Sequence, residues 1–114
     1  MNHEITLDEA IDLTKRFRTL RPTVLNPLYE AIDILPTCET FDREAVQALL
    51  NANPDCASFR IYYGMTDDLK VHAVLVAADA NGADLLPAPG NENVILEGSQ
   101  RCPNTCPPAS SLNS

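Results

Sequence analysis

The fold of this chain is decided by residues 57–86, which read ASFRIYYGMTDDLKVHAVLVAADANGADLL. Near the start of this stretch Phe59, Ile61 and Tyr63 alternate with Arg60 and Tyr62. Side chains that alternate with a period of two point to opposite faces of a β-strand. The pattern predicts a half-buried strand with an apolar face and a polar face.

Two further strands are predicted from the same stretch. Residues 69–78 are rich in valine and are apolar on both faces from Ala73 onward, which is typical of a central strand whose second face is also covered at one end. Asn81-Gly82 predicts a type I′ hairpin turn, in which both central residues need positive φ. The third strand begins at Asp84, and residues 93–97 supply a last strand that continues it or pairs at an edge.

The preceding half of the chain reads as helix. Thr6 and Glu9 have the spacing of a capping box, which starts a helix with one apolar stripe. The helix is predicted to end at Arg21-Pro22, because the residue before proline is pushed out of the helical region. A second helix is predicted from Asp42, where Phe41 and Val46 are spaced as a hydrophobic staple.

The segment between these helices has two interpretations. Asn26-Pro27 favours a short helix, since proline at the first helical position loses no hydrogen bond. The apolar run that follows, residues 31–35, could equally be extended. Whether residues 22–39 are helical is therefore left open.

These elements predict one α+β domain in residues 1–98 and a Pro-, Cys- and Ser-rich tail in residues 99–114. The length of 114 residues suits a single domain. The expected architecture has two layers, with two or three N-terminal helices packed on a three- to four-stranded antiparallel meander. The helical core positions are Leu7, Ile11, Phe17, Val46, Leu49 and Leu50, and they are expected to meet Phe59, Ile61, Tyr63 and one face of residues 71–77.

The charge balance excludes one class of partner. Sixteen acidic and eight basic side chains give a formal net charge of −8, which would repel a nucleic-acid backbone. The first residues contain no basic, apolar leader, and no run of about 18 apolar residues occurs. The expectations are no nucleic acid, no membrane and a cytoplasmic location.

Five motifs stand out in the chain, at residues 5–11, 41–45, 60–64, 74–84 and 102–106. Taken in order, they resemble a group of small bacterial proteins of no assigned activity, frequent in Bacteroidetes. That group has a capped N-terminal helix, a valine-rich strand followed by Asp-Ala-Asn-Gly, and a tail with cysteine and proline. The resemblance implies bacterial origin and one compact domain, and it transfers no catalytic residue.

The cysteines offer one candidate site. Cys102 and Cys106 are separated by three residues, which allows one loop to chelate a metal, but Cys38 and Cys56 have no close cysteine neighbour. Three interpretations stay open for the pair: thiols without a role, a disulfide, or a metal site. No cofactor is expected, with zinc as the alternative.

A second candidate site is the polar face of the sheet. Alternation places Arg60 and Tyr62 on one face, and antiparallel pairing could bring His72 beside them. Such a face could hold a carboxylate or a partner protein. The alternative is that it has no function, because antiparallel sheets often expose one polar face to solvent.

The sequence favours a non-enzymatic function. It contains no glycine-rich phosphate loop, no Gly-x-Ser-x-Gly elbow and no His-Glu-x-x-His pair. The leading hypothesis is an interaction module that binds a protein partner, or itself as a homo-oligomer, through the outer sheet face. The alternatives are a metal- or thiol-binding protein using Cys102 and Cys106, and a ligand binder or enzyme using Arg60, Tyr62 and His72.

Overall fold

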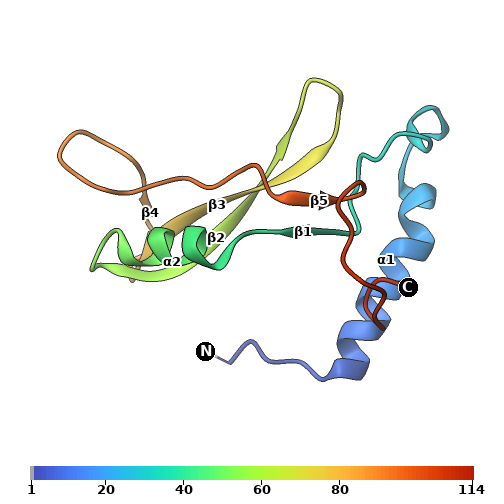
Figure 1. Ribbon diagram of the computed structural model, residues 1–114, viewed down its shortest axis with the longest axis horizontal. Helices are drawn as coiled ribbons and strands as arrows, with labels where there is room; N and C mark the ends of the chain where they lie inside the picture. The colour runs from blue at the N-terminus through green and yellow to red at the C-terminus, as the bar shows by residue number, and fades with distance from the viewer. Residues whose placement is uncertain (1) are drawn as a thin grey trace.

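The computed structural model describes residues 2–114 as an α+β fold, as predicted, with a three-stranded and a two-stranded antiparallel sheet. The helices are α1 (Leu7–Val24), the 3₁₀ turn η1 (Pro27–Tyr29) and α2 (Arg43–Asn51). The strands are β1 (Cys38–Thr40), β2 (Cys56–Met65), β3 (Val71–Asp79), β4 (Asp84–Leu85) and β5 (Gln100–Cys102). Figure 1 shows the β1–β5 ribbon lying between the larger sheet and α1.

The larger sheet has the order β2-β3-β4, so β3 is central, as its sequence predicts. In the β2–β3 pairing, Ile61 lies opposite Leu75 and Tyr62 lies opposite Val74. Residues 93–97 do not form the predicted last strand. They contribute one antiparallel bridge, in which Leu96 exchanges backbone hydrogen bonds of 2.8 and 3.0 Å with Leu75.

The hairpin between β3 and β4 differs from the predicted type I′ turn. Gly82 has a φ of +84°, whereas Leu69 is the one non-glycine residue with positive φ among residues 2–114. Asn81 therefore lacks the conformation that type I′ requires. The cause is Asp79, whose Oδ1 accepts hydrogen bonds of 2.9 Å from the N–H groups of Asn81 and Ala83 and so favours a wider turn.

The start of α1 is the predicted capping box, but its end is not where the sequence places it. The Glu9 N–H donates to Thr6 Oγ1 at 3.1 Å, and the Thr6 N–H donates to Glu9 Oε1 at 3.2 Å. The helix continues past Arg21 to Val24 with Pro22 inside its last turn. Proline lacks an N–H donor and its ring crowds the carbonyl one turn earlier, but only two helical residues follow Pro22.

The predicted packing of α1 on the sheet is wrong, because α1 contains no buried residue. Leu7 and Phe17, two expected core positions, are exposed. Instead Arg18 donates hydrogen bonds to the backbone oxygens of Leu112 and, at 3.2 Å, Ser114, so the C-terminus lies beside α1 (Figure 1). The Cα radius of gyration of 16.3 Å exceeds the roughly 13 Å of a compact chain of this length.

The hydrophobic core lies between α2 and β3. Leu49 of α2 is buried against Leu75 and Ala77. A nine-residue helix is about 14 Å long, whereas a ten-residue strand spans about 33 Å. Since α2 covers only part of β2 and α1 lies elsewhere, much of the sheet face predicted to be buried remains open. Phe41, Cys56, Leu85, Val94 and Leu96 complete this core.

The segment predicted as a tail is partly built into the fold. β5 lies within it and pairs with β1, placing Arg101 opposite Glu39. The open question of residues 22–39 resolves into the last turn of α1, η1 and the start of β1. Asn26 caps η1 by accepting the Leu28 N–H at 3.0 Å.

Candidate interaction site

The candidate site is the outer edge of β2. On β3, the N–H and C=O of Leu75 bind Leu96 and the N–H of Asp79 binds Ala83. These groups point away from β2, so by the alternation of an antiparallel ladder the residues between them bind β2. It follows that Arg60 and Tyr62 direct their backbone groups to β3.

Phe59, Ile61 and Tyr63 therefore direct their N–H and C=O groups to the opposite, open side of β2. Among residues 2–114, no hydrogen-bond partner lies on that side. A strand edge of this kind is a template for another polypeptide strand.

The far edge of β3 is closed over its whole length. β4 pairs with Ala77 and Ala78, and Leu96 with Leu75. Nearer the start of β3, side chains rather than a strand bind the backbone. Both Glu39 carboxylate oxygens accept a hydrogen bond from the Ala73 N–H at 3.0 Å. The contrast with β2 is therefore between one protected and one unprotected edge of the same sheet.

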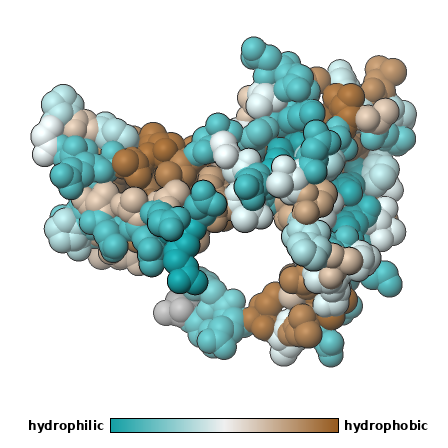
Figure 2. Space-filling view, in the orientation of Figure 1, coloured by the Kyte–Doolittle hydropathy of each residue, from teal (hydrophilic) through white to brown (hydrophobic). Residues whose placement is uncertain are grey.

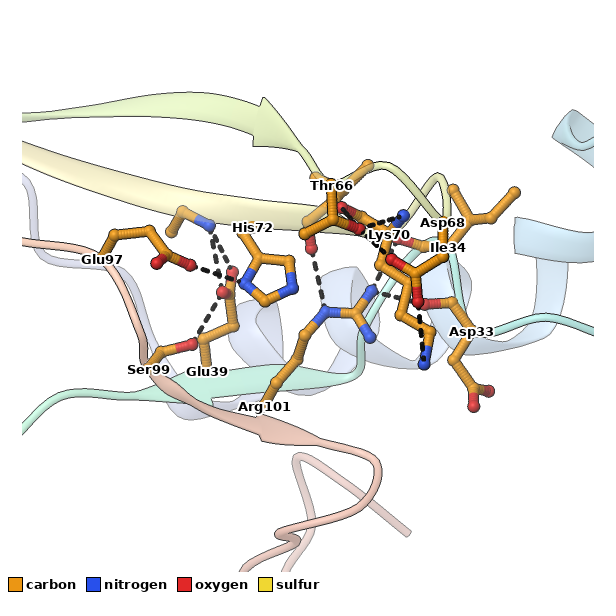
Figure 3. Close-up of polar contacts among 12 residues, drawn as sticks. Asp33, Ile34, Glu39, Thr66, Asp68, Lys70, His72, Glu97, Ser99 and Arg101 are labelled. Carbon is orange, nitrogen blue, oxygen red and sulfur yellow. Dashed lines mark hydrogen bonds and ion pairs between the residues drawn. The ribbon is translucent and has the colours of Figure 1, made fainter.

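Arg101 completes this closure. It is 8% exposed, and it donates to the backbone oxygens of Val71 at 2.9 Å, Ile34 at 2.8 Å and Asp33. The Val71 N–H donates to the Ile34 oxygen at 2.8 Å. Figure 3 shows Arg101 and Glu39 reaching from the β1–β5 ribbon toward the start of β3.

His72 belongs to this closed end, and the structure does not bring it into contact with Arg60 or Tyr62. Its Nδ1 lies 2.9 Å from Glu97 Oε1, an ion pair when the imidazole is protonated (Figure 3). Glu97 follows the Leu96 bridge, and Ser99 donates from its hydroxyl to Glu39 at 2.8 Å. The predicted three-residue face is thus divided between two separate clusters.

The other two members of that face bind a third side chain. Asp84 accepts from the Arg60 guanidinium at 2.5 Å and from the Tyr62 hydroxyl at 2.5 Å. The Tyr62 hydrogen bond, followed by the Arg60 contact, lowers the pKa of Asp84, and the Asp84 hydrogen bond raises the pKa of Tyr62. Arg60 and Tyr62 are therefore committed to Asp84 rather than free to hold a ligand carboxylate.

The apolar surface of β2 lies on the opposite face. Phe59, Ile61 and Tyr63 are 49%, 47% and 80% exposed. They line a groove of about 400 Å³, which Phe41 and Val46 border on the α2 side. Figure 2 shows apolar surface over the sheet, and a second apolar area on the α1 half across an open gap.

The outer sheet face offers less apolar surface than the sequence suggests. Val76 and Ala78, which share that face with Arg60, are 3% and 0% exposed. The interaction surface expected at residues 74–78 is thus already covered at Val76 and Ala78, and Val74 is half-buried. The exposed apolar side chains lie instead on the face that the helices were predicted to cover.

Cys102 and Cys106 form a disulfide, one of the three interpretations of the pair. This bond uses the thiols that the zinc alternative requires. Among residues 2–114, no cluster of three or more His, Cys, Asp or Glu side chains has a geometry that could hold a metal ion. No helix in the same range combines the length and apolarity needed to cross a membrane.

Comparisons of the chain with protein-family models, curated proteins and solved structures found no match. The resemblance to small bacterial proteins accordingly stays a prediction.

The sequence reasoning missed Glu39, Asp84 and Arg101 as partners in these clusters. Asp84 carried a usable signal, because the first residue after the β3–β4 turn lies opposite Ala78, on the face of Arg60. Arg101 carried none, since it is a single basic residue in a segment without periodicity.

Proposed function

We propose that this chain is a protein-interaction module that takes up an extended polypeptide along the open edge of β2. The observation that carries the proposal is the row of unpartnered backbone groups at Phe59, Ile61 and Tyr63. A strand added there would gain main-chain hydrogen bonds that do not depend on its sequence.

Side chains next to this edge would supply selectivity. Phe59, Ile61 and Tyr63 lie on one face and continue into the groove beside Phe41 and Val46. In β-strand addition, alternate side chains of the bound segment enter such depressions. The preferred ligand is therefore a segment with apolar residues at every second position.

Beyond the irregular register between Cys56 and Ser58 at its start, β2 has few of the devices that keep strand edges from pairing. Its ten residues contain no proline and no lysine, and their one charged residue is Arg60. Asp84 neutralises that charge at 2.5 Å. Proteins usually block long edges with charges, prolines or covering segments, and this chain does so at β3 but not at β2. The difference supports a binding role for the β2 edge.

The test is selection of extended peptides from a displayed random library by the full chain at low concentration. We expect enriched peptides to be apolar at alternate positions. Ile61→Lys places a charge on the edge and should reduce binding of an enriched peptide at least about tenfold. The matched control is Gln47→Lys, an exposed position of α2, which should bind as the parent does.

Two results would contradict the proposal. One is the absence of any enriched peptide, and the other is equal binding by the parent and Ile61→Lys chains. Circular dichroism of each variant would verify that both retain the fold of the parent.

A further inference from the structure

We infer that the polypeptide bound by β2 is the β2 strand of a second copy, antiparallel, with the two-fold axis at Ile61. The inference rests on the proposed function and names its partner. It follows from the order of residues along the strand, which is complementary to itself when reversed.

The backbone restricts where the axis can lie. A residue on the axis meets its own counterpart in a hydrogen-bonded pair if its N–H and C=O point to the open side, and in a non-hydrogen-bonded pair if they point to β3. Each residue from Phe59 to Tyr63 is therefore a possible axis position. The choice among the five depends on which side chains each axis brings together.

An axis at Ile61 places Phe59 opposite Tyr63 of the second copy, and Ile61 opposite itself. The pairs lie on the groove face, where all three side chains are exposed. Cross-strand pairs of aromatic and β-branched residues stabilise antiparallel sheets. Three such pairs, each exchanging two N–H···O bonds, give about six new hydrogen bonds.

The same axis places Arg60 opposite Tyr62 of the second copy on the other face. A guanidinium beside a tyrosine ring is a favourable contact. Because Asp84 already neutralises Arg60 in each copy, no unpaired like charges meet across the axis.

The other axes give poorer pairings. An axis at Arg60 would place this guanidinium opposite its own counterpart. An axis at Tyr62 would place Phe59 opposite Met65 and Arg60 opposite Gly64, so both the Phe59–Tyr63 pair and the contact between Arg60 and a tyrosine ring would be lost. An axis at Phe59 would place Tyr63 opposite Asp55, outside the strand. An axis at Tyr63 would place Phe59 opposite Asp67, in the turn after β2. Only the Ile61 axis keeps the three exposed apolar residues paired with one another.

The surface is large enough for a small dimer. Phe59, Ile61, Tyr62, Tyr63 and Met65 are 46–80% exposed, which amounts to roughly 500 Å² per copy if each side chain offers about 200 Å². If the dimer covers all of this surface, the pair buries about 1,000 Å², the lower bound for a specific interface. The product is one continuous sheet with the three strands β2, β3 and β4 from each copy.

Disulfide trapping tests both the partner and the register. The full chain is prepared with Cys38→Ala and Cys56→Ala, which removes the free thiols, and Ile61→Cys is added. Opposed residues of a hydrogen-bonded pair have Cα atoms about 5.5 Å apart, within disulfide range. We expect mild oxidation to convert most of this chain into a covalent dimer.

Further variants test the register and the specificity of the cross-link. Tyr63→Cys alone and Phe59→Cys alone should stay monomeric on oxidation, whereas a mixture of the two chains should cross-link. Gln47→Cys, exposed on α2, measures cross-linking by random collision and should give little dimer. Ile61→Lys should weaken self-association at least about 100-fold, because two lysines would meet at the axis.

Cross-linking of Tyr63→Cys with itself as readily as Ile61→Cys would overturn the inferred axis. Absence of an Ile61→Cys dimer, in a chain that retains the circular dichroism spectrum of the parent, would overturn the inferred self-pairing about Ile61. If the chain nevertheless selects peptides that Ile61→Lys loses, the proposed function stands with another partner. If peptide selection also fails, both are wrong.

Discussion

Arg101 is expected to stabilise the fold more than any exposed arginine does, because it is nearly buried and serves three backbone oxygens. Arg101→Met keeps a long side chain but removes every donor. The backbone oxygens of Val71 and Ile34, now bonded at 2.9 and 2.8 Å, would then lose their charged donor. The β1–β5 ribbon would lose its main attachment to the start of β3.

The size of the effect follows from these contacts. A hydrogen bond from a charged donor contributes about 1.5–3 kcal/mol. Three such bonds are lost, but the Ile34 oxygen keeps its bond from the Val71 N–H, and relief from burying a charge offsets a further part of the loss. We expect the free energy of unfolding to fall by about 3 kcal/mol. With a urea dependence of about 1.5 kcal/mol per molar, the midpoint should fall by about 2 M.

Urea unfolding monitored by circular dichroism without reductant measures this change. Arg16→Met removes an exposed arginine of α1 and should change the free energy of unfolding by less than about 0.5 kcal/mol. Arg101→Lys keeps the charge without the forked donor geometry, so its urea midpoint should lie between those of Arg101→Met and Arg16→Met. A midpoint for Arg101→Met equal to that of Arg16→Met would refute the reasoning.

Three further predictions concern the sheet and the disulfide. Ultraviolet titration should show a raised pKa for Tyr62, above the ordinary value near 10, and Asp84→Asn should lower that pKa. The stability that the protonated Tyr62 supplies is present below pH 10 and is lost as the pH rises through the raised pKa. Gly82→Ala should lower the free energy of unfolding in urea by about 1 kcal/mol, because a residue with a side chain is strained at a φ of +84°. The added methyl group itself would meet nothing closer than Arg60 Nη2 at 3.9 Å. An unchanged midpoint would argue against this turn. Cys106→Ser should lower the free energy of unfolding by at most about 2 kcal/mol, since the disulfide closes a very short loop. A larger decrease would show that the bond does more than restrain the unfolded chain.

Local signals in the sequence predicted the local elements. The Thr6–Glu9 capping box, the helix after Asp42 and the period-two pattern around Ile61 all correspond to observed structure. Each depends on contacts between residues close in sequence, or on one repeating pattern. The turn at Asn81-Gly82 was wrong because the hydrogen bonds to Asp79 outweighed the preference for a type I′ turn. The end of α1 was wrong because Pro22 lies in the last turn, where a proline disturbs few helical residues.

The arrangement of the elements was less predictable. An amphipathic stripe in α1 indicates that some surface covers it, but it does not identify that surface. The clusters around Glu39 and Arg101 depend on the pairing of β1 with β5, whose residues are about 60 positions apart in the chain. Part of the candidate site could be predicted, since Arg60 and Tyr62 do share a face, whereas the open edge of β2 required knowledge of which strand lies outermost.

Amide hydrogen exchange along β2 tests the central claim most directly. In the full ¹⁵N-labelled chain, Arg60 and Tyr62 should be protected at every protein concentration because their N–H groups bind β3. Phe59, Ile61 and Tyr63 should exchange rapidly in dilute solution and become at least about tenfold slower as concentration rises and the second copy binds. Rapid exchange of those three amides at all concentrations would contradict self-pairing through the open edge of β2.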